Sequence, residues 1–267
     1  MKIATYNVNS INARLENLQK WLVQEKPDVV LLQEIKCEFN DFPFFDLQAI
    51  GYEAKVLGQK SYNGVAALSR NKLKVIAENL PNFEDVQARY LEVETEVNGL
   101  RCRLASIYLP NGNPPYNNPD DDSRYEYKLK WMEALYKRAS ALLELKMPVI
   151  LGGDFNVILT DADVYAPDEY RKNALFRIEA RQRLRALMNL GYYDAFRYLH
   201  RSKSGYTFWD YAGGALQNDM GMRIDYLLLS PYAADLLQDC EVYMEPRRGD
   251  KPSDHTVLMA KLREKNE

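Results

Sequence analysis

Short apolar runs alternate along the chain with longer segments in which apolar residues recur every three or four positions. The longer segments predict helices, and one of them begins at Ser10, a favourable N-cap residue, while another ends at Gly191. The predicted helices are 10–25, 125–146 and 175–190. The short runs predict strands at 2–7, 29–32, 64–69, 149–151, 224–229 and 256–261. This alternation predicts an α/β fold.

A different pattern follows residue 89. Apolar and polar residues alternate through 90–97, and a second apolar segment occupies 101–109. Asn98-Gly99 between them is a strong turn signal, so we expect a half-exposed antiparallel hairpin. A hairpin next to buried strands indicates mixed sheets rather than a purely parallel sheet.

One stretch, 110–119, is rich in Pro, Asn and Gly, and three aspartates follow it. The apolar segments on both sides of it end in similar polar residues. We therefore interpret it as a long loop inside a single domain that covers 1–267, and not as a linker between domains.

Composition excludes several classes of protein. Hydrophobic residues make up 46% and charged residues 27% of the chain, which is ordinary for a soluble globular protein. There is no apolar run of about 20 residues that could span a membrane, and the N-terminal residues lack a signal-peptide core. The cysteines are three in number and widely spaced, namely Cys37, Cys102 and Cys240. These features predict a cytoplasmic protein without a disulfide framework, a structural zinc site or membrane attachment.

Polar residues recur where the predicted strands end. Such ends line up along one rim in α/β folds, where ligands bind. A single Asn or Asp in this place is ordinarily a turn former, but here the pattern occurs six times. The residues are Asn7 with Asn9, Gln33-Glu34, Asn111, Asp154 with Asn156, Asp225, and Ser253-Asp254-His255.

Asp225 lies inside an apolar run, and burying its carboxylate without a partner would cost several kcal/mol, on the order of 2–7. We therefore expect a hydrogen-bond donor close to it, and His255, flanked by Ser253 and Asp254, is the best candidate. An Asp that orients an imidazole is a known arrangement in acid–base chemistry. The only other histidine, His200, is interpreted as structural.

Oxygen ligands with at most one histidine suit Mg²⁺ or Mn²⁺ better than zinc or copper. Glu34 is the first choice of ligand, and Asp254, Asn7 and Asn9 are expected near it. Asp154 and Asn156 are two residues apart, so in an extended segment they would face the same way. A carboxylate that positions water, next to an amide that holds a phosphoryl oxygen, would form a working pair.

These residues make the chain similar, along essentially its whole length, to the exonuclease III family of DNA-repair nucleases within the endonuclease/exonuclease/phosphatase superfamily. Asn9 differs from the aspartate of some relatives, and Ile35 replaces the threonine of many. The segments that carry the resemblance are Thr5-Tyr6-Asn7-Val8-Asn9-Ser10, Leu32-Gln33-Glu34, Tyr108-Leu109-Pro110-Asn111-Gly112, Gly153-Asp154-Phe155-Asn156, Arg223-Ile224-Asp225-Tyr226 and Ser253-Asp254-His255.

The resemblance implies a four-layer α/β sandwich, in which two mixed β-sheets pack face to face with helices outside. It also implies Mg²⁺-dependent hydrolysis of phosphodiesters in duplex DNA, with incision 5′ to abasic sites and 3′→5′ removal of nucleotides or 3′ blocking groups. Mn²⁺ is expected to substitute for Mg²⁺.

The resemblance further assigns roles to single residues. The metal set is Glu34, Asn7, Asp254, Asp154 and Asn156, with Glu34 as the principal ligand. Asp154 would position or deprotonate the attacking water, and either Asp154 or His255 could be the general base. The remaining catalytic roles are phosphate binding by Asn156 and His255, orientation of His255 by Asp225, and assistance to the leaving oxygen by Tyr108. A cation with preorganised donors would stabilise the charge that develops on the phosphoryl oxygens.

Contacts with DNA are expected at some distance from the chemistry. The segment 206–211 also resembles the family, and the resemblance implies that Trp209 lines the pocket of an extruded abasic sugar, whereas Phe208 could belong to the pocket or to the core. Arg177, Arg181 and Arg185 fall on one face of the predicted third helix, where either solvent or DNA phosphate could meet them. The full DNA-binding set is Arg89, Asn111, Arg177, Arg181, Trp209 and Arg248.

The net charge of −3 speaks by itself against a nucleic-acid partner. However, residues 171–203 contain nine basic and two acidic residues, so this region carries +7 and the rest of the chain −10. A local basic region is consistent with a monomeric enzyme that binds duplex DNA at abasic sites or 3′ ends and then releases it. Two alternatives remain: a superfamily phosphatase that acts on phospholipid or inositol head groups, and a DNA-binding relative without catalytic activity.

Overall fold

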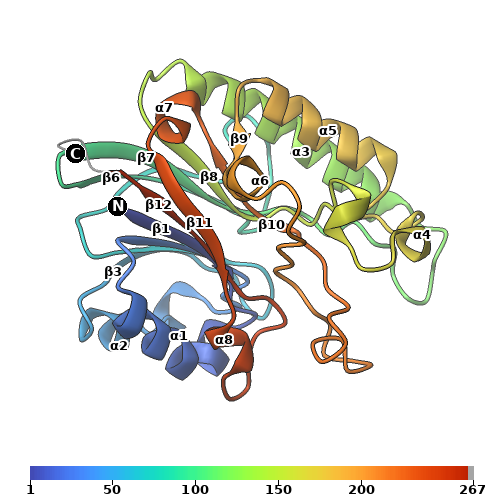
Figure 1. Ribbon diagram of the computed structural model, residues 1–267, viewed down its shortest axis with the longest axis horizontal. Coiled ribbons are helices and arrows are strands. Elements are labelled where there is room, and N and C mark those ends of the chain that lie inside the picture. The colour runs from blue at the N-terminus through green and yellow to red at the C-terminus, as the bar shows by residue number, and fades with distance from the viewer. Residues whose placement is uncertain (264–267) are drawn as a thin grey trace.

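The computed structural model describes residues 1–263, which form two six-stranded mixed β-sheets packed face to face, with helices on both outer sides (Figure 1). The strands of the first sheet are β1 Lys2–Asn7, β2 Val29–Gln33, β3 Glu53–Leu57, β4 Val65–Ser69, β11 Leu237–Tyr243 and β12 Val257–Leu262. The strands of the second are β5 Lys74–Glu78, β6 Tyr90–Val97, β7 Leu100–Tyr108, β8 Val149–Asp154, β9 Tyr193–Asp194 and β10 Asp225–Leu229.

The two sheets have the same internal arrangement. Their strand orders are β11-β12-β1-β2-β4-β3 and β9-β10-β8-β7-β6-β5. In each sheet the two central strands, β1 with β2 and β8 with β7, are parallel, and the other neighbours are antiparallel. This confirms the predicted mixed sheets.

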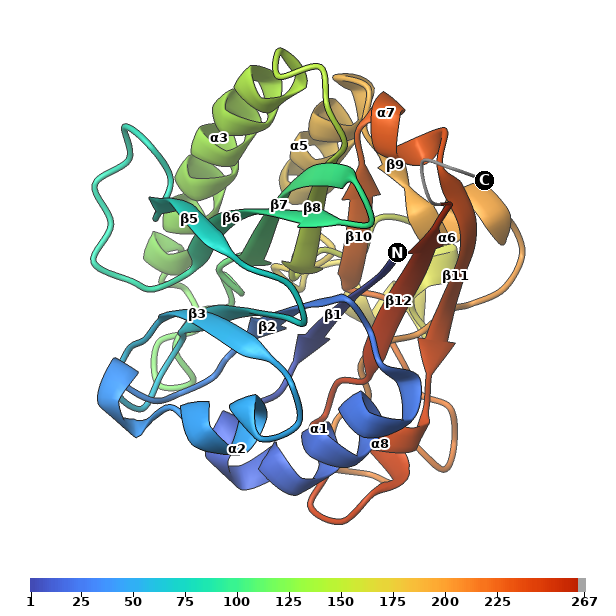
Figure 2. The same ribbon diagram turned by 90° about the vertical axis from the view of Figure 1, so that its left-hand side faces the viewer.

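Helices form the two outer layers of the sandwich, as Figure 2 shows. On one side α1 packs against the first sheet and contacts α8; on the other, α3 and α5 lie together over the second sheet. The helices are α1 Ile11–Glu25, α2 Phe44–Gln48, α3 Ser123–Leu143, α4 Pro167–Tyr170, α5 Ile178–Asn189, α6 Ala195–Leu199, α7 Pro231–Ala234 and α8 Glu245–Arg248. The predicted four-layer sandwich is confirmed.

Burial on both faces explains the continuous apolar strands. In β2, Val29 and Leu31 point into the core between the sheets, whereas Val30 and Leu32 point to the layer of α1. Side chains alternate along a strand, so a central strand with a covered face on each side needs apolar residues at every position. The same rule produced the correct predictions of β1, β4, β8 and β10.

The predicted hairpin is present, but its exposure was predicted wrongly. Asn98 and Gly99 have φ angles of 49° and 75° and connect Val97 to its partner Leu100, as a two-residue turn requires. Glu92 and Glu94, which were expected to face solvent, are buried instead. Arginine side chains pair with both carboxylates, and this makes their burial possible.

Helix boundaries differ in ways that affect function. Ser10 precedes α1 as predicted, but its φ is 84° and its side chain makes no capping hydrogen bond. The helix α5 starts at Ile178, three residues later than predicted, so Arg177 lies before it and not on its face. The edge strands β3, β5, β9 and β11 were not predicted: β9 has only two residues, and the other three are partly exposed and correspondingly polar in sequence.

None of the helices within residues 1–263 combines the length and the apolar character needed to cross a membrane.

Candidate active site

The polar strand ends meet at one edge of the sandwich. Asn7 is the last residue of β1, and Glu34 directly follows β2, the parallel neighbour of β1. Asp154 ends β8 and lies opposite Asp225, the first residue of β10. His255 lies two residues before β12, which runs antiparallel to β1. Both sheets therefore contribute to one site, as the strand-end pattern predicts.

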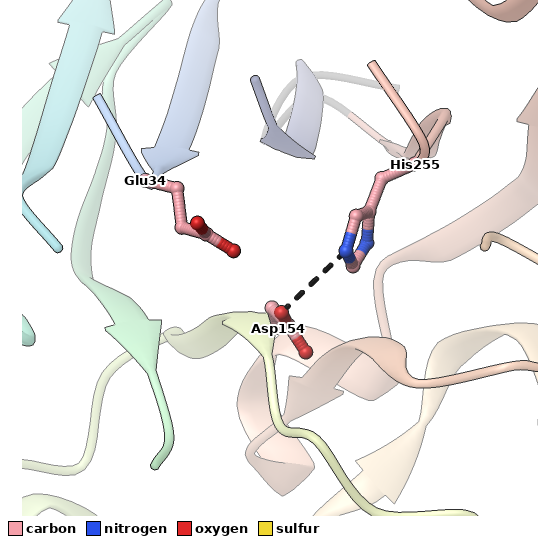
Figure 3. A group of neighbouring side chains, drawn as sticks. All are labelled: Glu34, Asp154 and His255. Atoms are coloured by element: carbon pink, nitrogen blue, oxygen red, sulfur yellow. Dashed lines mark ion pairs between the residues drawn. The ribbon is translucent and has the colours of Figure 1, made fainter. Parts of the chain in front are cut away.

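Glu34, Asp154 and His255 form the centre of the site (Figure 3). Each offers one ligand atom, and these atoms lie within 4.8 Å of one another. The imidazole Nε2 of His255 is 3.7 Å from Oδ2 of Asp154, the pair marked in Figure 3. Asp154 and His255 are almost completely buried, whereas Glu34 is partly exposed, so the group opens to solvent on the Glu34 side.

The expected contact between Asp225 and His255 is confirmed. Nδ1 of His255 lies 2.8 Å from Oδ2 of Asp225, and the second carboxylate oxygen, Oδ1, is buried without a hydrogen-bond partner. Burial alone would lower the pKa of His255, but Asp225 and Asp154 outweigh it and raise this pKa to about 10. The ring therefore tends to be a cation whose Nε2–H points to the centre of the site.

Asp154 is held by amides on two sides. It accepts hydrogen bonds from Nδ2 of Asn7 at 3.0 Å, from the backbone N–H of Asn156 at 2.9 Å and from Nδ2 of Asn156 at 3.2 Å. Burial raises the pKa of Asp154 to about 7; His255 opposes this rise, and the carboxylates of Asp225 and Glu34 reinforce it. A carboxylate with this pKa can exchange a proton near neutral pH.

Glu34 ionises more readily than Asp154. Its Oε1 accepts from Nδ2 of Asn7 at 2.9 Å, and its Oε2 lies 2.9 Å from Nζ of Lys36. Burial would raise the pKa of Glu34, but the lysine and the amide together hold it below its usual value. Lys36 also donates to Oδ1 of Asn9 at 2.6 Å, so an ammonium group already balances part of the negative charge.

Strained backbone accompanies this chemistry. Asn9, Glu34 and Asn156 have φ angles of 45°, 48° and 47°, in the left-handed region that non-glycine residues rarely occupy. Such residues cost on the order of 1–3 kcal/mol each and persist where the surroundings hold them. Asn156 was expected to face the same way as Asp154 in an extended segment. It reaches Asp154 instead by turning its backbone, so that expectation was right about proximity and wrong about conformation.

A further amide, Asn111, extends the site along the loop after β7. Its Nδ2 donates to Oδ1 of Asn156 at 3.1 Å, and Nδ2 of Asn156 also donates to the carbonyl of Leu109 at 2.9 Å. Arg89 donates to the carbonyl of Tyr108 at 3.2 Å, and its guanidinium lies 4.7 Å from the centre of that ring. Burial, together with Glu34 and Asp154, raises the pKa of Tyr108 well above its usual value, so the hydroxyl stays protonated.

A polar cavity of about 580 Å³ adjoins these side chains. Tyr108, Asn111 and Arg89 form part of its wall. Its other lining residues are polar or aromatic for the most part and include Tyr62, Asn63, Gln87, Arg124 and Tyr127. The cavity has the size and the donors to hold a nucleotide-sized anionic group beside Tyr108 and Asn111.

The donor set fits a hard divalent cation. Two carboxylates, Glu34 and Asp154, stand together with amides around them, and oxygen-rich sites of this type suit Mg²⁺ or Mn²⁺. Asn7 turns its amide nitrogen to the carboxylates, while its Oδ1 accepts from the backbone N–H of Asn9 at 3.1 Å. The carboxylate of Asp254 accepts from Nδ2 of Asn9 at 3.0 Å and is not a member of the central group.

The two aromatic residues after Thr207 differ from each other in exposure. Trp209 is only 4% exposed, and its Nε1 donates to Asp219 at 3.1 Å, so the ring has almost no surface to offer to a sugar. Phe208 is partly exposed, and its ring centre lies 5.0 Å from that of His255. The backbone of Phe208 pairs with that of His255, which fixes this contact. The aromatic wall of the site is thus Phe208.

The arginines of the basic region are already engaged by the protein. Arg177 lies 3.7 Å over the ring of Tyr125 and pairs with Asp122 at 2.8 Å. Arg181 donates to the carbonyl of Leu159 at 3.0 Å and lies over the ring of Phe176. Arg248, the remaining arginine proposed to bind DNA at a distance from the site, is exposed at the end of α8.

Two lysines near the site were not predicted. Lys36 could have been found from its place two residues after Glu34. Lys128 is fully buried on α3, in line with Tyr125 and Trp131 at three-residue spacing, and a lysine inside an apolar stripe is the sequence signal for it.

Comparison with known proteins agrees with this geometry. The model of the endonuclease/exonuclease/phosphatase family matches residues 4–255. Exodeoxyribonuclease III of Haemophilus influenzae is 30% identical over 275 residues, and the match covers 98% of this chain and 100% of that protein.

Two solved structures extend the similarity to the fold. An AP endonuclease from Archaeoglobus fulgidus superposes with a TM-score of 0.89 and 33% identity, covering 98% of this chain and 99% of that one. The 3′ phosphatase NExo from Neisseria, described as bound to a product DNA hairpin, gives a TM-score of 0.89 and 35% identity, with coverage of 98% and 99%.

Proposed function

The chain belongs to the endonuclease/exonuclease/phosphatase family as an exonuclease III-type DNA-repair nuclease, and from this premise we propose that it cleaves duplex DNA 5′ to abasic sites and at 3′ ends with Mg²⁺ as its cofactor. The observation that carries the proposal is the group of Glu34, Asp154 and His255, backed by Asp225. Mn²⁺, an oxygen-seeking cation of similar preference, would substitute.

In this proposal the side chains divide the work. Glu34 is the principal metal ligand, with Asn7, Asp254, Asp154 and Asn156 beside it. A bound cation would balance the negative charge on the phosphoryl oxygens. The roles of the other side chains follow from their protonation and surroundings.

Asp154 takes the proton of the attacking water, because its pKa lies near neutrality while His255 is held as a cation by Asp225. His255 donates its Nε2–H to oxygens of the scissile phosphate, and Asn156 donates an amide N–H to them by exchanging its longer hydrogen bond, the one to Asp154. Tyr108, whose hydroxyl stays protonated, donates to the phosphate or to the leaving oxygen.

The DNA would pass over the cavity of about 580 Å³, where Arg89 and Asn111 meet the phosphodiester backbone. Phe208 takes over the pocket role first expected of Trp209, because it is the partly exposed ring at His255. Arg177, Arg181 and Arg248 would contribute weaker, salt-sensitive contacts.

A parallel assay tests the proposal. Duplexes with one abasic site, with a 3′-phosphate and with a matched 3′ end are incubated with Mg²⁺, with Mn²⁺ and with EDTA, alongside inositol phosphates. We expect metal-dependent cleavage of the abasic and 3′-end substrates. Hydrolysis confined to inositol phosphates would replace the proposal by the head-group phosphatase, and metal-independent binding without cleavage would replace it by a non-catalytic relative.

The setting of the enzyme is part of the same proposal. Cys37, Cys102 and Cys240 are buried free thiols, which fits the reducing cytoplasm. We expect residues 1–267 to work as a single catalytic domain and as a monomer, which light scattering of the purified protein would check.

A further inference from the structure

Lys128 is a charged side chain buried at the centre of the layer between α3 and the second sheet. It has no exposed surface, and its helical neighbours Tyr125, Trp131 and Met132 belong to the apolar core. Burying a lysine is costly unless all of its donors are satisfied. Its presence at this position therefore calls for a role that an apolar residue could not fill.

The ammonium group is satisfied by backbone carbonyls alone. Nζ of Lys128 donates to the oxygens of Asn111 at 2.9 Å, of Asn156 at 2.6 Å and of Ala174 at 3.2 Å. An ammonium has three N–H donors, so all of them are used. Burial lowers the pKa of Lys128 to about 7, and the nearby Asp154 opposes that decrease.

The three carbonyls belong to segments that are far apart in the sequence. Asn111 lies in the loop after β7, Asn156 follows β8, and Ala174 precedes α5. The backbone N–H of Ala174 donates to Oδ1 of Asn113 at 3.0 Å, which ties the first segment to the third. Lys128 thus joins three loops that are otherwise connected by single backbone hydrogen bonds, from Leu109 to Asp154 and from Ile158 to Leu175.

Two of these loops carry side chains of the active site. Asn111 donates to Asn156, and Asn156 donates to Asp154. The backbone of Asn156 is held in the left-handed region at φ 47°, and its carbonyl is the one closest to the ammonium of Lys128. The route from Lys128 to Asp154 consequently has one intermediate residue, Asn156.

Gly112 shows how closely the loop fits the lysine. Its φ is +85°, and a Cβ added there would lie 2.7 Å from Cδ of Lys128. Contacts as short as this do not occur, so the loop approaches the lysine stem as closely as a glycine permits. The packing of the Lys128 stem against Gly112 and the hydrogen bond from its Nζ to the carbonyl of Asn111 thus hold the same loop.

We propose that Lys128 is a positioning residue of the nuclease: it fixes Asn156 and the loop of Asn111 in the conformation that serves Asp154 and the scissile phosphate. The inference rests on the proposed nuclease activity. It assigns Lys128 no contact with substrate, and its effect passes through Asn156.

A double-mutant cycle tests this route. Lys128→Met keeps the aliphatic stem and removes the three donors, and Asn156→Ala removes the side chain through which the effect is expected to pass. We expect Lys128→Met to lower kcat/KM on the abasic duplex at least tenfold in the otherwise unchanged enzyme, but less than twofold when Asn156→Ala is already present. Lys130→Met, an exposed lysine of the same helix, is the matched control and should leave kcat/KM unchanged.

A different result of the cycle would contradict the proposal, and failure of the variant to fold would require another substitution at Lys128. An equal loss in both backgrounds would mean that Lys128 acts by general stability, and no loss would mean that it has no role in catalysis. If circular dichroism shows that Lys128→Met does not fold, the cycle is run with Lys128→Arg, which keeps the charge but cannot aim three donors at these carbonyls. Absence of cleavage by the unaltered enzyme would refute the proposed function itself, which is a separate outcome.

Discussion

Two largely buried clusters of charged side chains differ in electrostatic character, one beside the second sheet and the other at the edge where both sheets contribute to the site. The outer cluster consists of Glu92 and Glu94 on β6, Arg101 and Arg103 on β7, and Arg138 on α3. The site cluster, at the strand ends, consists of Glu34, Asp154, Asp225 and His255. Both contain glutamate or aspartate side chains with almost no exposed surface.

In the outer cluster every carboxylate has guanidinium partners. Arg103 and Arg138 lie 2.7 Å and 2.8 Å from Oε1 of Glu92. Burial would raise the pKa of Glu92, but the hydrogen bonds from Arg138, Tyr90 and Arg103 hold it below its usual value. The three guanidinium groups outnumber the two carboxylates, and Nε of Arg103 is buried without a hydrogen-bond partner, so no carboxylate of this cluster lacks a cation.

The site cluster has more carboxylates than cations, even when the ion pair of Lys36 with Glu34 is included. Three of its side chains are carboxylates and one is an imidazole, Oδ1 of Asp225 has no partner, and the pKa of Asp154 is raised to about 7. A protein that buries unbalanced negative charge loses stability unless a cation or a proton compensates it. The comparison teaches that matched charges stabilise the fold, while unmatched ones mark where a ligand belongs.

Asp154→Asn should give the largest effect, because it removes the proposed base and one metal ligand together. We expect kcat on the abasic duplex to fall by roughly a thousandfold, about 4 kcal/mol of transition-state stabilisation. The melting temperature should stay equal or rise, since one unbalanced carboxylate is gone. Single-turnover kinetics and thermal unfolding measure the two quantities; activity within tenfold of the unaltered enzyme would end the case for Asp154 as the base.

Glu92→Ala should have the reverse profile. It leaves Arg103 and Arg138 buried without their carboxylate, at a cost of about 3–5 kcal/mol in the free energy of unfolding. The activity of the molecules that remain folded should change less than twofold. Urea unfolding measures the loss, and Glu96→Ala, an exposed position on the same strand, is the control, with an expected change within about 0.5 kcal/mol. A loss below 1 kcal/mol at Glu92 would make the outer cluster energetically unimportant.

Much of this comparison was accessible from the sequence, and the reason lies in topology. Strands covered on both faces have continuous apolar runs, so β2 and β8 were predicted together with the polar residues at their ends. Because β1 and β2 are parallel and β12 is antiparallel to β1, Asn7, Glu34 and His255 reach the same edge. The order of apolar strands and polar strand ends in the sequence was therefore enough to predict most of the residues of the site.

Long-range pairing was not accessible in this way. The alternation in β6 predicted exposed glutamates. This prediction was wrong because the partners of Glu92 come from β7 and α3, and the residues next to Glu92 in sequence do not indicate them. Trp209 is another case: the family resemblance implied a pocket role, but the exposure of its ring depends on packing against Tyr206 and on the hydrogen bond to Asp219. Left-handed residues such as Asn156 depend equally on distant contacts.

Metal binding should reveal the unbalanced charge through its pH dependence. The pKa of Asp154 is raised to about 7, so below pH 7 a proton occupies the carboxylate that a cation would share, and the ion must displace it. The apparent Mg²⁺ affinity should fall up to tenfold per pH unit below 7 and become constant above it. Calorimetry without DNA, from pH 5.5 to 8.5, measures this, and Asp154→Asn should abolish the slope. An unchanged affinity across the range in the unaltered protein would show that Asp154 is not protonated in the metal-free site.

The smallest effect is expected from the basic region. Its charges are partly paired, unlike the carboxylates of the outer cluster, which are fully paired, and unlike those of the site cluster, which are in excess. Arg181 already donates to Leu159 and lies 3.7 Å from Asp161, so only part of its charge is available to a DNA phosphate. Arg181→Gln should weaken binding of a matched duplex about threefold at low salt and reduce the slope of log K against log salt by at most about one. Fluorescence anisotropy at several salt concentrations measures both, with Arg183→Gln on another face of α5 as the control. Equal slopes for the two variants would place Arg181 with the outer cluster, as a charge that serves only the fold.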